Sequence, residues 1–177
     1  DQDIHKIVDV FNKQLEIPKY SRFVSNDEIA DPKNDYNLNI PRYIDSQEAE
    51  DIQDISAHLL GGIPERDVDA LSEYWTAYPG LRDALFQPSK RKGYLDGKVT
   101  KDAIKQTIFN HPDFKAFSAS MSDVFKTWEQ DTITELKALK NGFKPKQIIH
   151  QIAESLLATY TGKPLMDKYD VYQHLMN

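Results

Sequence analysis

The most specific pattern in this chain is the stretch Asn34-Asp35-Tyr36-Asn37-Leu38-Asn39-Ile40-Pro41-Arg42-Tyr43-Ile44. Apolar and polar residues alternate in its second half, where Leu38 and Ile40 fall on one face. Such alternation is typical of a half-buried strand, so we predict a strand over residues 37–44. Pro41 lacks an amide N–H that a neighbouring strand could bond, which places this strand at the edge of a sheet or at a bulge.

The residues before this stretch predict a helix, a second strand and a short capped helix. Apolar residues recur at helical spacing over residues 3–15, which indicates an amphipathic helix. Tyr20–Val24 is rich in aromatic and β-branched residues and is predicted to be a strand. Ser25 and Glu28 have the spacing of a capping box. The two strands should pair antiparallel, although an isolated pair is marginal without more sheet or a helix to pack on.

Residues 46–177 are predicted to be almost entirely helical. Proline and glycine residues divide this region into amphipathic segments, and long helices are expected to begin at Pro112 and Pro145. Pro88–Gly97 is polar, basic and contains glycine, so it is predicted to be a loop. The sequence therefore predicts a mainly α fold with a short antiparallel strand pair near its N-terminus. It divides into residues 1–45 and residues 46–177.

Composition restricts the class of protein. Of the 177 residues, 40% are hydrophobic and 28% charged, which is ordinary for a soluble globular protein. The chain contains no cysteine, no charged-then-apolar leader and no apolar run long enough to span a bilayer. These features predict a cytoplasmic protein without disulfides. The chain opens at Asp1 on one helical pattern and closes at Asn177 inside another, so we expect a fragment of a longer protein.

The net charge of −6 is unevenly distributed. Residues 1–70 hold 16 acidic and 7 basic residues, whereas residues 71–177 hold 12 acidic and 15 basic residues. Such asymmetry indicates an acidic docking face and a region tolerant of nucleic acid, or more simply the solvated surfaces of helices. The strongest DNA-binding candidates are Lys90, Arg91 and Lys92, three cations beside an aromatic residue in a predicted loop. The simpler alternative is a solubilising loop tip.

No group of residues predicts catalysis, cofactor binding or a metal site. The pair Gly61-Gly62 follows a predicted helix, so it indicates a helix stop and not a phosphate-binding loop. The five histidines show no metal-binding spacing. Asn110-His111-Pro112-Asp113-Phe114 is a partial likeness of the Asn-Pro-Pro-aromatic motif with which amino-methyltransferases hold a flipped base. No strand precedes it, and a helix entry with Asn110 as cap and Pro112 as first residue explains it better.

Several runs of residues resemble the modification subunit of type I restriction-modification systems. In the first part of the chain they are Ile7-Val8-Asp9-Val10-Phe11, Tyr20-Ser21-Arg22-Phe23-Val24-Ser25 with Glu28-Ile29, and the stretch from Asn34 to Ile44. Two later runs are similar to the helical tail of a longer-tailed branch of the family. They are Gly61-Gly62-Ile63-Pro64-Glu65-Arg66-Asp67-Val68-Asp69-Ala70-Leu71 with Tyr74-Trp75, and Tyr169-Asp170-Val171-Tyr172-Gln173-His174-Leu175-Met176.

The resemblance implies part of an N6-adenine DNA methyltransferase that uses S-adenosylmethionine in bacterial defence. It implies that the strand pair is the tail of a Rossmann-like methyltransferase sheet. The helical region would dock the specificity subunit, and in many systems a restriction subunit, and would help to enclose DNA.

The cofactor loop and the catalytic motif of the family match no position here, so this piece alone is expected to be inactive. In isolation, its unpaired strand edges favour dimerisation. The alternative, from another class, is a freestanding helical protein-binding module unrelated to methylation. The uneven charge and the aromatic-rich helices suit that alternative equally well.

Overall fold

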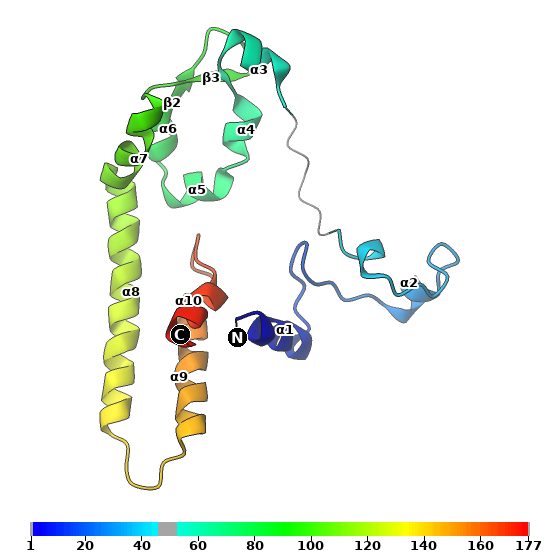
Figure 1. Ribbon diagram of the computed structural model, residues 1–177, viewed down its shortest axis with the longest axis vertical. Helices are drawn as coiled ribbons and strands as arrows, with labels where there is room; N and C mark the ends of the chain where they lie inside the picture. Colours follow the sequence, from blue (N-terminus) through cyan, green and yellow to red (C-terminus); the bar gives the residue numbers. More distant parts are fainter. Residues whose placement is uncertain (1, 46–52, 177) are drawn as a thin grey trace. The chain divides into compact units, whose positions relative to one another are not determined.

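A computed structural model describes residues 2–45 and 53–176 (Figure 1). The chain divides into two compact units. The first unit comprises Asp1–Ile52 with Met176–Asn177, and the second unit comprises Gln53–Leu175. Helices dominate the described residues, which confirms the predicted mainly α fold. The predicted start of the helical region at residue 46 lies outside the described residues.

Residues 2–45 of the first unit contain three short helical elements. α1 (Gln2–Lys13) has the amphipathic pattern expected of it, and its polar side carries an ion pair of 2.7 Å between Lys13 and the buried Asp9. α2 (Asn26–Ala30) begins after Ser25, whose Oγ accepts a hydrogen bond from the Glu28 N–H, as the capping pattern predicted. The 3₁₀ helix η1 (Ile40–Arg42) follows a series of turns.

The two strands predicted in the first unit are wrong. Within residues 2–45 the extended pairing is a single isolated bridge between Ile17 and Ser21. Residues 37–44 instead enter η1, where Pro41 occupies the first turn and its missing N–H costs nothing. An isolated strand pair has too little burial to hold two extended segments together, so local turns satisfy the backbone groups.

Side chains hold these turns in place. The buried Asn34 donates from Nδ2 to the Glu28 carbonyl at 2.7 Å. Arg22 makes two parallel bonds of 2.8 and 2.9 Å to the Glu28 carboxylate, the geometry of a strong charge-assisted pair. Tyr43 donates its hydroxyl to the Asn37 carbonyl at 2.6 Å. The polar residues of the Asn34–Ile44 stretch therefore serve to fix the conformation of a loop and not to pair strands.

The second unit combines a small sheet with a series of helices. Its first half contains α3 (Ile55–Leu60), β1 (Ile63–Pro64), α4 (Glu65–Asp69), α5 (Ser72–Ala77), α6 (Leu81–Leu85), β2 (Phe86–Pro88) and β3 (Tyr94–Gly97). Its second half contains α7 (Lys101–Asn110), α8 (Pro112–Lys137), α9 (Pro145–Tyr160) and α10 (Lys168–Met176). α8 and α9 begin at Pro112 and Pro145, the two prolines predicted from the sequence to start helices.

The predicted loop over residues 88–97 is wrong, because this segment is most of a β-hairpin. β3 pairs antiparallel with both β2 and β1, in the order β1-β3-β2. The buried Leu95 anchors β3, and Pro88 is tolerated because β2 lies at the edge of the sheet. Gly61 and Gly62, both with positive φ, end α3 as predicted.

Two apolar clusters stabilise the second unit. In the first, Tyr78, Leu81 and Leu85 pack against partly buried residues of α8, among them Phe114 and Phe117. In the second, side chains of α9 and α10 bury one another; its members are Ala153, Leu157, Tyr169 and Tyr172. α10 is therefore held against α9 by apolar packing.

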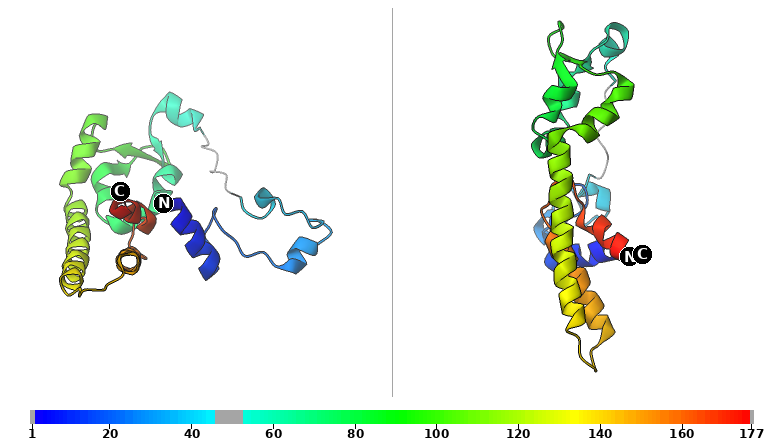
Figure 2. Two further views of the ribbon diagram at one scale, coloured as in Figure 1. Left: turned by 60° about the horizontal axis from the view of Figure 1, so that its bottom comes forward. Right: turned by 90° about the vertical axis from the view of Figure 1, so that its left-hand side faces the viewer.

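α8 and α9 form a helical hairpin. α9 runs beside the C-terminal half of α8 in two views (Figures 1 and 2). Trp128 on α8 donates its indole N–H to the Ser155 hydroxyl on α9 at 2.9 Å. Gln151 bonds Glu135 across the same seam at 2.5 Å. The N-terminal end of α8 is tied elsewhere, because Asp113 accepts the Gly80 N–H at 2.6 Å.

Candidate nucleic-acid interface

The three candidate cations lie in the turn between β2 and β3, which we call the hairpin turn and define as residues 89–93. Its backbone closes through the Ser89 N–H, which donates to the Tyr94 carbonyl at 3.1 Å. Gly93 has a φ of 82°, a conformation that favours glycine. Its carbonyl accepts the Glu65 N–H at 2.9 Å, so the turn is tied to the start of α4.

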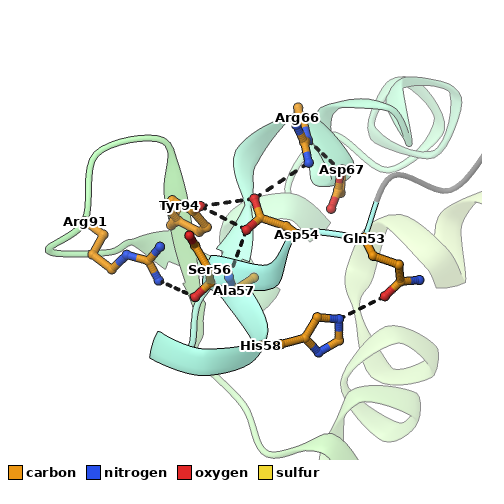
Figure 3. Close-up of polar contacts among 9 residues, drawn as sticks. All are labelled: Gln53, Asp54, Ser56, Ala57, His58, Arg66, Asp67, Arg91 and Tyr94. Atoms are coloured by element: carbon orange, nitrogen blue, oxygen red, sulfur yellow. Dashed lines mark hydrogen bonds and ion pairs between the residues drawn. The ribbon is translucent and has the colours of Figure 1, made fainter.

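Arg91 directs its guanidinium into the second unit. Nη1 donates to the Gly61 carbonyl at 2.6 Å. It also donates to the Ser56 carbonyl at 3.2 Å (Figure 3). The guanidinium also lies 3.8 Å from the centre of the Tyr94 ring, within the range of a cation–π contact. A cation at the C-terminal end of α3 satisfies carbonyls that the helix leaves open.

Lys90 and Lys92 are exposed beside Arg91. In the part of the chain that the structure describes, neither forms an ion pair with an acidic side chain. Of the three predicted residues, these two present free positive charge to solvent, whereas Arg91 organises the turn that carries them. DNA contact by this turn stays a prediction.

Asp54 holds the strand that follows this turn, through a contact with Tyr94 of β3. It is the N-cap of α3 and accepts the Ala57 N–H at 2.9 Å, while the Tyr94 hydroxyl donates to both carboxylate oxygens at 3.1 and 3.2 Å (Figure 3). Nη2 of Arg66 lies 3.6 Å from Oδ2 of Asp54 and forms an ion pair with it. The Ala57 hydrogen bond lowers the pKa of Asp54 the most, helped by Tyr94 and Arg66 and opposed by partial burial.

The contacts of Asp54 are those of a structural residue and not of a general base. A general base that works near neutral pH needs a pKa near that pH, and the pKa of Asp54 is lowered instead. Asp54, Tyr94 and Arg91 form a connected set that fixes β3 and its turn to both ends of α3. From the sequence, Asp54 is one of several acidic residues expected on solvated helix surfaces. Its position before an apolar helical run is nevertheless a recognisable N-cap signal.

Replacing Asp54 with asparagine is expected to remove an acid-sensitive part of the stability of the second unit. Because the pKa of Asp54 is below its usual 3.8, the charged form stabilises the fold above that pH. This contribution is lost as the pH falls through the lowered pKa. Asparagine still caps a helix, so D54N changes the charge and keeps the cap. Melting temperatures measured from neutral to acidic pH should differ most at neutral pH and converge in acid. A constant difference would contradict the charge effect.

The described residues do not fit S-adenosylmethionine or a metal ion. A methyltransferase cofactor loop needs glycines between a strand and a helix, and here Gly97 alone stands at the end of β3 before α7. Within residues 2–45 and 53–176, no three His, Asp or Glu side chains gather as metal ligands. The fragment of a catalytic motif at residues 110–114 is a helix junction, as expected. His111, and not Asn110, is the N-cap of α8, and Pro112 is its first residue.

A second basic segment was not among the residues predicted from the sequence to bind DNA. Lys137, Lys140, Lys144 and Lys146 lie at the turn between α8 and α9, and all four are exposed. A count of acidic residues along the chain would have found them, because none occurs from residue 136 to residue 153. The charge summed over the whole C-terminal part hides this local excess.

Comparison with known protein families gives a match, and it lies in the first unit. Residues 1–52 match the family model of N-6 DNA methylases. This segment of the chain is therefore similar to N-6 DNA methylases, which supports the resemblance carried by residues 34–44. The match does not reach the hairpin turn. Neither the curated proteins nor the solved structures gave a match. No helix within the described ranges is both long and apolar enough to cross a membrane.

Proposed function

We propose that this chain is part of the DNA methyltransferase (modification) subunit of a type I restriction-modification system. The observation that carries the proposal is the methylase match over residues 1–52. In this proposal the parent subunit acts in the cytoplasm and transfers a methyl group from S-adenosylmethionine to N6 of adenine in DNA. Residues 1–45 are the end of its methyltransferase core, and the helical region docks partner subunits and helps to enclose DNA.

The chemistry belongs to another part of that subunit. The chain carries neither a glycine-rich cofactor loop nor a complete Asn-Pro-Pro-aromatic motif. Catalysis on a flipped base requires both a cofactor and such a motif to hold the exocyclic amine. The 177 residues therefore contribute surfaces, and we assign them no catalytic, cofactor-binding or metal-binding residue.

The first unit presents an apolar groove of about 770 Å³. α1 forms one wall, where Ile7 is 58% and Phe11 82% exposed, and Phe23 and Ile40 contribute to the others. Large apolar side chains gathered in one exposed groove are typical of a surface that another protein segment covers. In the parent subunit, the remainder of the methyltransferase core would cover this groove. The side chains that line the groove would then be buried.

Replacing Ile7 and Phe11 together with asparagine is expected to reduce self-association of the 177-residue chain. The two side chains are already in water, so their loss costs little folding stability, while the apolar contact between molecules is removed. Analytical ultracentrifugation over a range of protein concentrations measures the change. The control is Lys19→Asn with Lys33→Asn, two exposed residues of the same unit. Equal association of both variants would contradict the role of the groove.

The helical hairpin offers a docking face to a partner subunit. Phe125 and Leu136 are both exposed on α8 and are eleven residues apart, which places them on one side of the helix. This side borders the seam with α9, so a further helix could pack against both. Two helices alone leave such a stripe in water, and helices from another chain would bury it.

Co-purification with the cognate specificity subunit tests the docking proposal. The chain should be retained by the specificity subunit, and Phe125→Asn with Leu136→Asn should weaken retention. Ser120→Asn with Thr127→Asn is the matched control, because it places the same residue type at exposed positions on the other side of α8. Absence of any association contradicts the proposal. A separate experiment tests the proposal that the cofactor site lies in another part of the subunit. Calorimetric titration of this chain with S-adenosylmethionine should show no binding, and clear binding would contradict that proposal.

A further inference from the structure

The turn between α8 and α9 is the most strongly basic segment of the second unit. Four lysines and no acidic residue occur between Glu135 and Glu154. Lys137 ends α8, Lys140 and Lys144 lie in the connection, and Lys146 lies in the first turn of α9. We call these four residues the helical-tip lysines.

Some cations of the described residues are held in ion pairs, as Arg66 is with Asp54, Arg82 with Asp69 and Lys13 with Asp9. The helical-tip lysines are not among them. None of the helical-tip lysines forms an ion pair among residues 2–45 and 53–176, and all are exposed. Their charge is therefore available to a partner.

The arrangement fits a repeated anion better than a single one. The lysines are spread over ten residues around an exposed turn, and none lines a described pocket. Lysine carries a point charge on a flexible stem, which suits contacts to successive phosphates along a backbone. In a chain of net charge −6, such a patch gives local attraction to a polyanion without general affinity for one.

The helical-tip lysines lie far from the hairpin turn. The α8–α9 turn follows the C-terminal end of α8, whereas the hairpin turn lies beyond its N-terminal end (Figures 1 and 2). The 26 residues of α8 alone extend over ~39 Å. A phosphate contact at the α8–α9 turn would therefore be separate from one at Lys90 and Lys92.

We propose that the α8–α9 turn is a second contact for the DNA phosphate backbone, made by Lys137, Lys140, Lys144 and Lys146. The inference rests on the proposed function, in which the helical region faces DNA. It goes beyond that function by naming a surface remote from Lys90 and Lys92. The contact is independent of DNA sequence, because phosphates carry no sequence information.

The test measures binding of the full chain to a duplex of ~30 base pairs, about three helical turns, by fluorescence anisotropy at several salt concentrations. Lys140→Ala with Lys144→Ala should weaken binding by roughly tenfold to sixtyfold at low salt and reduce the salt slope by about 2. Lys115→Ala with Lys126→Ala removes the same charge from exposed positions of α8 away from the α8–α9 turn and should have a much smaller effect. Melting temperatures should be unchanged in both variants, because all four side chains are exposed.

The possible outcomes separate the inference from the proposed function. If Lys90→Ala with Lys92→Ala weakens binding while the helical-tip variant equals its control, the inference is overturned and the DNA-facing role stands. If the parent chain binds no DNA, the DNA-facing role and the inference are both overturned. If the tip variant loses binding to phosphatidylserine vesicles and keeps its affinity for DNA, the turn is a membrane contact and the inference is overturned.

Discussion

Replacing Tyr78 with alanine is expected to lower the free energy of unfolding of the second unit by about 3–5 kcal/mol. Tyr78 is 7% exposed and is the aromatic centre of the first apolar cluster. Its ring lies 5.7 Å from that of Phe114 and 5.4 Å from that of Phe117. Alanine would leave a cavity between α8 and the segment before α6, which rigid neighbouring helices cannot fill.

The control is Tyr78→Phe, which keeps the ring and removes the hydroxyl. Burial raises the pKa of Tyr78, which agrees with a neutral phenol in an apolar setting. The phenylalanine variant should therefore stay within about 1 kcal/mol of the parent chain. Urea unfolding followed by far-ultraviolet circular dichroism measures all three proteins. A loss below about 1 kcal/mol for the alanine variant would show that the cluster does not hold α8 in place.

Replacing Leu157 with alanine is expected to cost about 2–5 kcal/mol and to release α10 from α9. Leu157 is 3% exposed and belongs to the cluster that includes Tyr169 and Tyr172. Because α10 is short, it depends on this packing more than on its own helical propensity. Limited proteolysis should cut before α10 sooner in the variant, in parallel with the loss of stability in urea.

Ile149→Ala is the matched control for this second prediction. Ile149 lies on the same helix and is 55% exposed, so the removal of a similar side chain there should cost far less. Equal losses at residues 149 and 157 would contradict the assignment of the buried face of α9.

The helices of the second unit were predictable because their start signals are local. Pro112 and Pro145 sit at first helical positions, where a fixed φ and a missing N–H are both favourable. The pair Gly61-Gly62 ends α3 for an equally local reason. Sequence patterns therefore located most helices without knowledge of their packing.

The strands were placed wrongly because their stability is not local. The alternation of Leu38 and Ile40 is as regular as that of a true strand, yet nothing among the described residues of the first unit pairs with it. The real β3 contains one buried side chain, Leu95, which pairs with Pro88 of β2, a strand that follows directly on α6. Pairing across a turn of basic residues left no period that a sequence could reveal.

The candidate site was predictable in its charges and not in its architecture. Lys90, Arg91 and Lys92 stood out as a run of cations. The role of Arg91 depends on the carbonyls of Ser56 and Gly61, which are backbone groups thirty and more residues away. Such partners follow from the fold alone, because every residue type carries the same carbonyl.

The bond between the indole of Trp128 and the Ser155 hydroxyl gives this chain a built-in optical probe. Both tryptophans, Trp75 and Trp128, lie in the second unit, and each donates its indole N–H to a protein oxygen. Tryptophan emission therefore follows the second unit and is silent about the first. Separation of α9 from α8 would expose that indole to water and shift its emission to the red, so opening of the helical hairpin can be followed without a label.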